Sequence, residues 1–419
     1  MHLSKNSFSS LGFNPRPSTV MHIDLNSCFA TIEQQANPFL RGKPIAVAAY
    51  ASPNAVILAP SVEAKRGGVK TGMRVKDGKK ICPTLKILTP DPDKYRYVHI
   101  KLRELLSPYS SCVVAKSIDE FVLDINDYVT VSGKTIYQIG GDIKKRITDE
   151  IGEWITVSIG MGPSRFIAKM ASNLKKPDGL EEINKDNVEE VYSKLSLIDL
   201  HGINYHNKVR LNKVGIYSVL DFYRAEPAWL KAAFMSISCY YWYLRLRGWD
   251  IDDVEYSRKT FGNSYALPGS KGTKSELLPI LQKLVEKTGS RLRKNGYRTK
   301  GVYLALLFKD GSYWHRSKNL KKIIFDSRDI YKEMINILNY CPEIKPVRII
   351  AENVYDLIKE SGLQLDLFRD IEKGLNVAKS IDSINQRWGE FSITPLRMVI
   401  ARDKIPDRIS FGGISELMK

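Results

Sequence analysis

Ser117-Ile118-Asp119-Glu120, followed by the apolar run Phe121-Val122-Leu123, is the stretch that decides the fold and the site of this chain. Its upstream counterpart is Val20-Met21-His22-Ile23-Asp24-Leu25. Both place carboxylates beside a run of strand character, and a carboxylate is costly to bury unless a positive group pairs it. Acids that converge at strand ends make an oxygen-rich site suited to magnesium, and two such ions about 4 Å apart are the usual device for nucleotidyl transfer. From spacing alone, two unrelated sets of surface acids are the alternative.

The composition is that of a basic globular protein. The 419 residues suffice for two to four domains, and 43% hydrophobic and 26% charged residues are ordinary values. Lys and Arg number 64 against 46 Asp and Glu, which gives a net charge of +18. Such a balance favours a polyanionic partner, either nucleic acid or an anionic membrane surface. No apolar run approaches the roughly 20 residues of a membrane span, and residues 1–18 read as a short polar tail rather than a signal peptide.

The cysteines indicate a reducing compartment. There are five, an odd number, and no two form a C-x-x-C pair. This pattern predicts a cytoplasmic protein with neither a disulfide framework nor a zinc site. The cysteines are Cys28, Cys82, Cys112, Cys239 and Cys341.

The first 182 residues alternate between strand and helix patterns, which predicts an α+β sheet domain interrupted by a small insertion at residues 37–90. The strands at 112–115 and 121–125 are expected to form a hairpin whose turn carries Asp119 and Glu120. Neighbours in a straight strand face opposite ways, so the backbone must twist there if both acids are to reach one site. Other expected elements are strands at 20–24 and 155–160 and helices at 29–37, 93–106 with Asp93 as its cap, 136–154 and 164–174.

The second half divides into a helical region and another α+β domain. Residues 183–249 read as short helices, with Gly202 at a tight turn and Gly215 at a helix C-cap. Such a hairpin offers N–H groups to a phosphate, although a plain αα-hairpin is the alternative. Residues 250–258 are a candidate linker, and a β–α–β–β–α–β pattern follows. The first part of that domain is rich in Lys and Arg, which favours a phosphate-binding surface over a merely solvated one; Lys300 and Arg316 are its candidate DNA contacts.

These motifs, taken in order, resemble the Y-family translesion DNA polymerases over about residues 20–400. The resemblance depends on a strand ending in Asp followed by aromatic, Ala and Glu positions, on Gly-Lys-Pro, on the Ser-Ile-Asp-Glu hairpin, on a Gly-rich strand end and on a Lys-Pro-x-Gly helix end. In this sequence they are Asp24, Cys28-Phe29-Ala30, Glu33, Gly42-Lys43-Pro44, Ser117 to Glu120, Gly160 to Ser164 and Lys176-Pro177-Asp178-Gly179.

The resemblance implies a role for each matching residue. Asp24, Asp119 and Glu120 would be the catalytic acids that hold two Mg²⁺ ions, with the backbone carbonyl of Leu25 as a further ligand. Phe29 would be the steric gate against the ribonucleotide 2′-hydroxyl; the alternative is a core aromatic residue. Lys176 would contact the triphosphate of the incoming deoxynucleotide.

The resemblance also implies a right-hand architecture on primer–template DNA: an α+β palm, small fingers, a helix-hairpin-helix thumb and a little finger. Small fingers cover little of the nascent base pair, so we expect loose geometric selection. The expected divisions are tail 1–18, palm 19–36 and 91–182, fingers 37–90, thumb 183–249, linker 250–258, little finger 259–402 and tail 403–419.

The chain departs from the commonest family pattern in the fingers. Many members grip the triphosphate with a Tyr and an Arg three residues apart, whereas these positions are Val62 and Lys65 here. An Arg fork is thus replaced by a point charge, and Lys65 is the expected nucleotide contact. These residues, together with Asn26, resemble the UmuC-type branch. That likeness implies a role in the SOS response to DNA damage, with a UmuD-like subunit and RecA as potential partners.

A short motif near the C-terminal end resembles the bacterial sliding-clamp-binding pentapeptide. It is Gln364-Leu365-Asp366-Leu367-Phe368. Its Gln and its Leu-Phe pair could fill an apolar pocket on the clamp, and it implies a bacterial source. A strand of the last domain is the alternative.

Two other functions compete with a polymerase. One is a catalytically weak, polymerase-like DNA-binding accessory protein in mutagenic repair, which loss of the acids would indicate; all three are present. The other is a nuclease with the same metals, which leaves Phe29, Lys176 and the helical hairpin unexplained.

Overall fold

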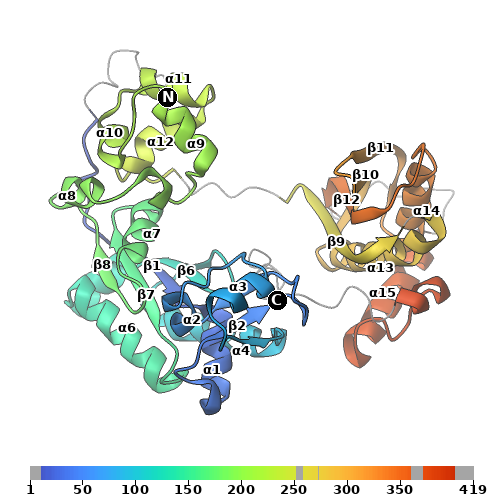
Figure 1. Ribbon diagram of the computed structural model, residues 1–419, viewed down its shortest axis with the longest axis horizontal. Helices are drawn as coiled ribbons and strands as arrows, with labels where there is room; N and C mark the ends of the chain where they lie inside the picture. The colour runs from blue at the N-terminus through green and yellow to red at the C-terminus, as the bar shows by residue number, and fades with distance from the viewer. Residues whose placement is uncertain (1–10, 252–257, 272, 360–370, 402–419) are drawn as a thin grey trace. The chain divides into compact units, whose positions relative to one another are not determined.

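The computed structural model describes residues 11–251, 258–271, 273–359 and 371–401, and these form two compact units (Figure 1). Of the described residues, 11–251 belong to the first unit and those from 258 to 401 belong to the second. Figure 1 colours the first from blue to yellow-green and the second from yellow to red. Most of the predicted linker, residues 252–257, lies outside the described residues.

A five-stranded sheet forms the centre of the first unit. In spatial order its strands are β5 (Val113–Ala115), β6 (Glu120–Asp124), β1 (Val20–Leu25), β7 (Val157–Gly162) and β8 (Leu180–Glu182). Neighbours are antiparallel except for β7 and β8. The predicted hairpin is confirmed, because β5 and β6 pair antiparallel around residues 116–119. Asp119 lies in its turn as expected, but Glu120 is the first residue of β6 rather than part of the turn.

The two faces of this sheet have different chemistry because side chains alternate along each strand. Met21 and Ile23 face a large core built with α4 (Pro92–Leu106) and α6 (Ile136–Glu150). Val20 packs on the other face, against α7 (Arg165–Leu174), and the pleat therefore places His22 and Asp24 on that side. Gly160 permits the close approach of α7, since a Cβ there would collide with the Ala168 carbonyl oxygen.

A smaller three-stranded sheet is inserted between α1 (Cys28–Ala36) and α4. Its order is β3 (Ile57–Pro60), β2 (Ile45–Ala48), β4 (Lys86–Leu88), and α2 (Val62–Arg66) and α3 (Val75–Ile81) belong to the same insertion. The side chain of Ser61 accepts from the Ala64 N–H and caps α2. The core is small and rich in alanine.

Five helices follow: α8 (Val188–Ser193), α9 (Tyr205–Asn212), α10 (Val219–Arg224), α11 (Pro227–Phe234) and α12 (Ser238–Leu246). Gly202 and Gly215 flank α9 with φ of +95° and +84°, values that favour glycine. Gly202 makes the expected turn, but α9 is capped at Lys213, so Gly215 lies two residues beyond the C-cap.

The N-terminal segment packs against this helical cluster. Phe13 is buried in the core of the cluster, and the Asn14 side chain donates to the Gly248 carbonyl oxygen at 2.9 Å. The Arg247 Nε donates to the Leu11 carbonyl oxygen at 2.9 Å. The prediction of a short polar tail over residues 1–18 is therefore wrong for residues 11–18, because Phe13 is buried and the backbone of this segment finds hydrogen-bond partners.

The second unit has the predicted β–α–β–β–α–β order. It contains β9 (Thr260–Lys271), α13 (Lys274–Lys294), β10 (Tyr297–Phe308), β11 (Tyr313–Ile324), α14 (Ser327–Leu338) and β12 (Val347–Lys359). The antiparallel sheet has the order β11-β10-β12-β9, and α13 and α14 bury their apolar faces against it. After β12, the described chain continues with α15 (Ile371–Trp388) and the 3-10 helix η5 (Leu396–Ala401).

Three boundaries differ from expectation by two residues or more. Asp91, rather than Asp93, caps α4, because Pro92 occupies the first helical turn and the Asp91 carboxylate accepts from the Lys94 N–H. The helix α6 ends at Glu150 instead of residue 154, and β7 spans Val157–Gly162 instead of residues 155–160. Within the described ranges, every helix falls short of the length or hydropathy that spanning a membrane requires.

Candidate active site

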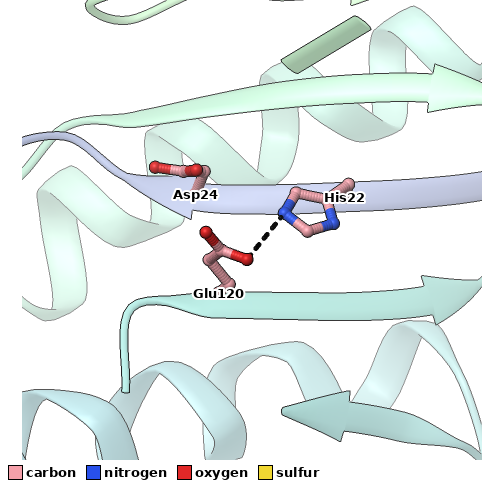
Figure 2. A group of neighbouring side chains, drawn as sticks. All are labelled: His22, Asp24 and Glu120. Atoms are coloured by element: carbon pink, nitrogen blue, oxygen red, sulfur yellow. Dashed lines mark ion pairs between the residues drawn. The ribbon is translucent and has the colours of Figure 1, made fainter. Parts of the chain in front are cut away.

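Asp24 and Glu120 meet at the α7 face of the five-stranded sheet. They are cross-strand partners on β1 and β6. One donor atom each from His22, Asp24 and Glu120 lie within 4.8 Å of one another, the only such group that could hold a metal ion among the described residues. Figure 2 shows the three side chains converging from the two strands. The pleat explains this convergence, because His22 and Asp24 are two residues apart and share a face.

Asp119 reaches the site from the bend just before β6. Because Asp119 is outside the strand, its side chain need not face away from that of Glu120, as adjacent side chains in a straight strand do. Its carbonyl oxygen accepts from the Leu25 N–H at 2.9 Å, and its carboxylate accepts from Ser117 Oγ at 2.5 Å. Burial, together with the charges of Asp24 and Glu120, raises the pKa of Asp119. Its carboxylate is outside the group formed with His22.

Two lysines neutralise the acid pair. Lys169 Nζ lies 2.9 Å from Asp24 Oδ2 and 2.6 Å from Glu120 Oε1, and Lys176 Nζ lies 2.8 Å from the same Asp24 oxygen. Burial alone would raise the pKa of Glu120, but its contacts with His22 and Lys169 lower that pKa to about 2. Burial likewise opposes the charge of Lys169, yet the two acids raise its pKa. Both partners of this contact are therefore ionised at neutral pH.

His22 is buried and its pKa is lowered, chiefly by desolvation. Its Nε2 lies 3.5 Å from Glu120 Oε2, the contact dashed in Figure 2. Within the described part of the chain, neither ring nitrogen has a hydrogen-bond partner. A neutral imidazole with an unpartnered nitrogen beside two carboxylates can bind a cation directly or orient Glu120.

Lys65 lies on α2, on the side of the site formed by the small sheet. Desolvation and the positive charge of Lys176 lower its pKa, while Asp24 and Asp119 oppose that shift. These mutual effects place Lys65, Lys176 and two of the acids within electrostatic reach of one another. Two ammonium groups that repel each other are suited to a shared polyanionic ligand.

Phe29 is fully buried on α1. Its ring stacks on Tyr95, with centroids 4.4 Å apart and an angle of 13° between the planes. The Tyr95 hydroxyl donates to Glu33 Oε1 at 2.9 Å, which anchors the stack. Complete burial is what the core alternative for Phe29 predicts, so its gate role stays a prediction.

The sequence interpretation missed His22 and Lys169, and it treated Asn26 only as a marker of branch. The Asn26 side chain donates to Ser158 Oγ at 2.9 Å and accepts from the Asp178 N–H at 2.8 Å. It thereby ties the end of β1 to the loop that carries Lys176. The signal for His22 was its i, i+2 spacing from Asp24; Lys169 had no comparable local signal.

A cavity of about 580 Å³ adjoins Glu120 on the side of the helical cluster. Gly202 and Trp242 line it, as do Lys169 and the basic residues Lys116, Arg165 and Arg245. Of the predicted DNA contacts, Gly202 is therefore beside the acids. A basic wall with an aromatic floor suits a nucleic-acid strand.

Of the other predicted DNA contacts, Gly215 follows α9 in the helical cluster of the first unit, whereas Lys300 and Arg316 lie in the second unit. Lys300 is half-buried on β10, whereas Arg316 is exposed on the edge strand β11, with its guanidinium 3.9 Å from the centre of the Tyr340 ring. Part of the basic run is internal: Lys283 is buried, and Arg293 pairs with Asp382 at 2.7 Å. The clamp-like motif, Gln364, Leu365, Leu367 and Phe368 included, lies outside the described residues.

Comparison with known proteins identifies the family. The impB/mucB/samB family matches residues 23–173, and its C-terminal domain matches residues 258–367. The chain is 30% identical over 380 residues to DNA polymerase IV 1 of Halalkalibacterium halodurans, covering 88% of this chain and 91% of the relative. It is 29% identical over 379 residues to DNA polymerase IV 1 of Bacillus subtilis, covering 88% and 90%. These names do not confirm the UmuC-type branch, which stays a prediction.

Solved structures share the fold. A Y-family DNA polymerase chimera of Dbh and Dpo4 superposes with a TM-score of 0.71 at 23% identity, covering 81% of this chain and 99% of the other. An insertion ternary complex of Dbh DNA polymerase gives 0.57 at 23% identity, with the same coverage. The right-hand fold expected from the motifs is thereby confirmed. The family match, the relatives and this fold agree with the acids at the ends of β1 and β6, and the chain belongs to the Y family of DNA polymerases.

Proposed function

We propose that this chain is a DNA-directed DNA polymerase that copies damaged templates by adding deoxynucleotides to a primer 3′-hydroxyl. The observation that carries the proposal is the meeting of Asp24 and Glu120 across β1 and β6, with Lys169 and Lys176 against them. Concentrated carboxylates suit metal-assisted phosphoryl chemistry, and the neighbouring ammonium groups suit a triphosphate.

The residues present fit Mg²⁺. Asp24, Asp119 and Glu120 supply hard carboxylate oxygens, and the buried His22 has an unpartnered nitrogen among the described residues. We assign two ions to these acids and the Leu25 carbonyl, with His22 orienting Glu120. When bound, the ions would lower the pKa of the primer hydroxyl and stabilise the charge on the leaving pyrophosphate.

The protein's own groups would hold the nucleotide. Lys176 and Lys65 would bind the triphosphate as point charges, and Asn26 would fix the Lys176 loop through its bond to the Asp178 N–H. Phe29 would limit space at the sugar. Its stack on Tyr95 would keep the ring rigid.

In this assignment the five-stranded sheet is the palm, the small sheet with α2 and α3 the fingers, α8–α12 the thumb and the second unit the little finger. The alanine-rich fingers core is consistent with a small domain and loose selection. We include the sliding clamp as a partner through residues 364–368. A UmuD-like subunit and RecA complete the proposal on the resemblance alone, and a cytoplasmic location rests on the cysteine pattern.

Primer extension on undamaged and abasic templates tests this function. We expect Mg²⁺-dependent extension past the abasic site, loss of extension in Asp119→Ala and Glu120→Ala, and nearly unchanged primer–template affinity in both variants. Extension at the wild-type rate by either variant would refute the assignment. The same assay with and without clamp tests whether residues 364–368 increase synthesis.

A further inference from the structure

We propose that Lys169 is a positioning residue that holds Asp24 and Glu120 together and limits how strongly this pair binds a divalent cation. The inference rests on the proposed function, which makes the pair part of a metal site. Its basis is that one ammonium group contacts oxygens of two acids on different strands, at 2.9 and 2.6 Å.

The fold holds Lys169 in this place. The residue lies on α7, which approaches the sheet closely over Gly160, and its side chain is only 12% exposed. By contrast, Lys134 and Asp142 form an ordinary surface pair at 2.6 Å, with both side chains more than 40% exposed. A contact that is built into a helix–sheet interface is screened far less by water and salt than a surface pair.

The contact changes the charge that a cation would meet. Asp24 and Glu120 lie opposite each other, so their carboxylates repel, and the ammonium between them offsets that repulsion. A carboxylate oxygen has a second lone pair, so Lys169 and a metal ion can share one oxygen. Sharing places two positive groups close together, and this repulsion weakens metal binding.

The weakening of cation binding by Lys169 applies to Asp24 and Glu120 and does not extend to Asp119. The Asp119 carboxylate accepts from the Ser117 hydroxyl, a neutral donor. Among the described residues, Lys176 forms an ion pair only with Asp24 and is 35% exposed, so it can move to a nucleotide. Lys169 therefore differs from Ser117 and Lys176, because it is enclosed and it bridges two carboxylates.

Manganese binding to the full chain, without DNA or nucleotide, tests the inference through the electron paramagnetic resonance signal of free Mn²⁺. We expect Lys169→Met to bind Mn²⁺ about tenfold or more tightly than the wild type, because a nearby positive charge is removed. Lys169→Arg keeps that charge and should bind as the wild type does. Lys134→Met is the control with the same charge change at the surface, and it should leave Mn²⁺ affinity unchanged.

Thermal melting separates positioning from a general structural role. Without metal, Lys169→Met and Lys169→Gln should melt below the wild type, and Mn²⁺ should raise their melting temperature more than it raises that of the wild type. Equal or weaker Mn²⁺ binding by Lys169→Met would overturn the inference. So would Lys169→Arg behaving like Lys169→Met, or failure of both the Met and Gln variants to fold even with Mn²⁺. Primer extension by the wild type is scored separately, so failure of the proposed function is distinguishable.

Discussion

Two glutamates on strands, one in each unit, have pKa values that are shifted in opposite directions. Glu120 on β6 is partly exposed and contacts Lys169 at 2.6 Å, and its pKa falls to about 2. Glu352 on β12 is buried, and burial raises its pKa to about 7 against hydrogen bonds from Thr288 and Asn263. Thr288 Oγ1 donates to Glu352 Oε1 at 2.6 Å, whereas Oε2 has no partner among the described residues.

The comparison shows that burial alone does not make a catalytic carboxylate. A cation within 3 Å keeps Glu120 ionised despite burial, as a metal ligand must be. Glu352 accepts hydrogen bonds from the neutral donors Thr288 and Asn263, and the charge of Arg291 offsets its burial only in part, so Glu352 is poised to accept a proton. Whether a buried carboxyl group is ionised therefore depends on the charge of the groups that contact it as well as on its burial.

The largest expected effect comes from the matched substitutions Glu120→Gln and Glu352→Gln. The first removes a charge that we assign to metal binding, so single-turnover nucleotide addition should fall by about a thousandfold or more. The second replaces a carboxyl group with a pKa of about 7 in the other unit, so nucleotide addition should change by less than about twofold. Similar losses in the two variants would break the comparison.

Glu352, which should matter little for nucleotide addition, should have a large effect on how stability depends on pH. The pKa of Glu352 is raised from 4.5 to about 7, so its stabilising effect is complete below pH 4.5 and is lost as pH rises through 7. At 1.36 kcal/mol for each of about 2.5 pH units, the loss is about 3 kcal/mol. Relative to the wild type, Glu352→Gln should thus gain about 3 kcal/mol of unfolding free energy between pH 4 and pH 8.

Hydrogen exchange of β10 and β12 amides in urea measures this effect in the second unit alone, which matters because two units need not unfold together. Asp382→Asn is a carboxylate control in the same unit, since Asp382 is paired with Arg293. A flat pH difference for Glu352→Gln would mean that Glu352 is ionised in the folded unit.

Phe29 sharpens the comparison because it is as buried as Glu352 but is proposed to act at the site, like Glu120. Phe29→Leu keeps most of the core volume and removes the flat ring. We expect ribonucleotide incorporation relative to deoxynucleotide to rise by about tenfold, a difference of about 1.4 kcal/mol. Steady-state incorporation of each nucleotide measures the ratio. An unchanged ratio with a lowered melting temperature would assign Phe29 to the core alone.

Local patterns predicted much of this molecule. The apolar runs beside Asp24 and Glu120 predicted β1 and β6, and alternating patterns in the second unit predicted its β–α–β–β–α–β order. The contact of Lys169 with Asp24 joins residues 145 positions apart and depends on how α7 packs over Gly160, which no local pattern encodes.

The N-terminal segment shows the same limit. Its polar composition predicted a polar tail, but buried Phe13 and the hydrogen bonds of Leu11 and Asn14 hold the segment against the helical cluster. Likewise, the basic run of the second unit predicted a surface. Lys283 and Arg293 instead point into the unit, because charge composition carries no information about which face of α13 a residue occupies.

The smallest expected effect tests whether the second unit contributes to DNA binding without contributing to nucleotide addition. Arg316 is exposed on the edge strand β11 and is held over the Tyr340 ring, so it can meet a DNA phosphate without first being ordered. Arg316→Ala should weaken primer–template binding by about two- to threefold and reduce the salt slope by about one, because a single phosphate contact is lost. Unlike Glu120→Gln, it should leave single-turnover addition at saturating DNA unchanged.

Arg328→Ala is the matched control, since Arg328 is exposed in the same unit and pairs with Asp326 at 3.2 Å. Equal losses of affinity in the two variants would mean that Arg316 contributes only net charge, and a slower addition step in Arg316→Ala would mean that the second unit takes part in the chemistry.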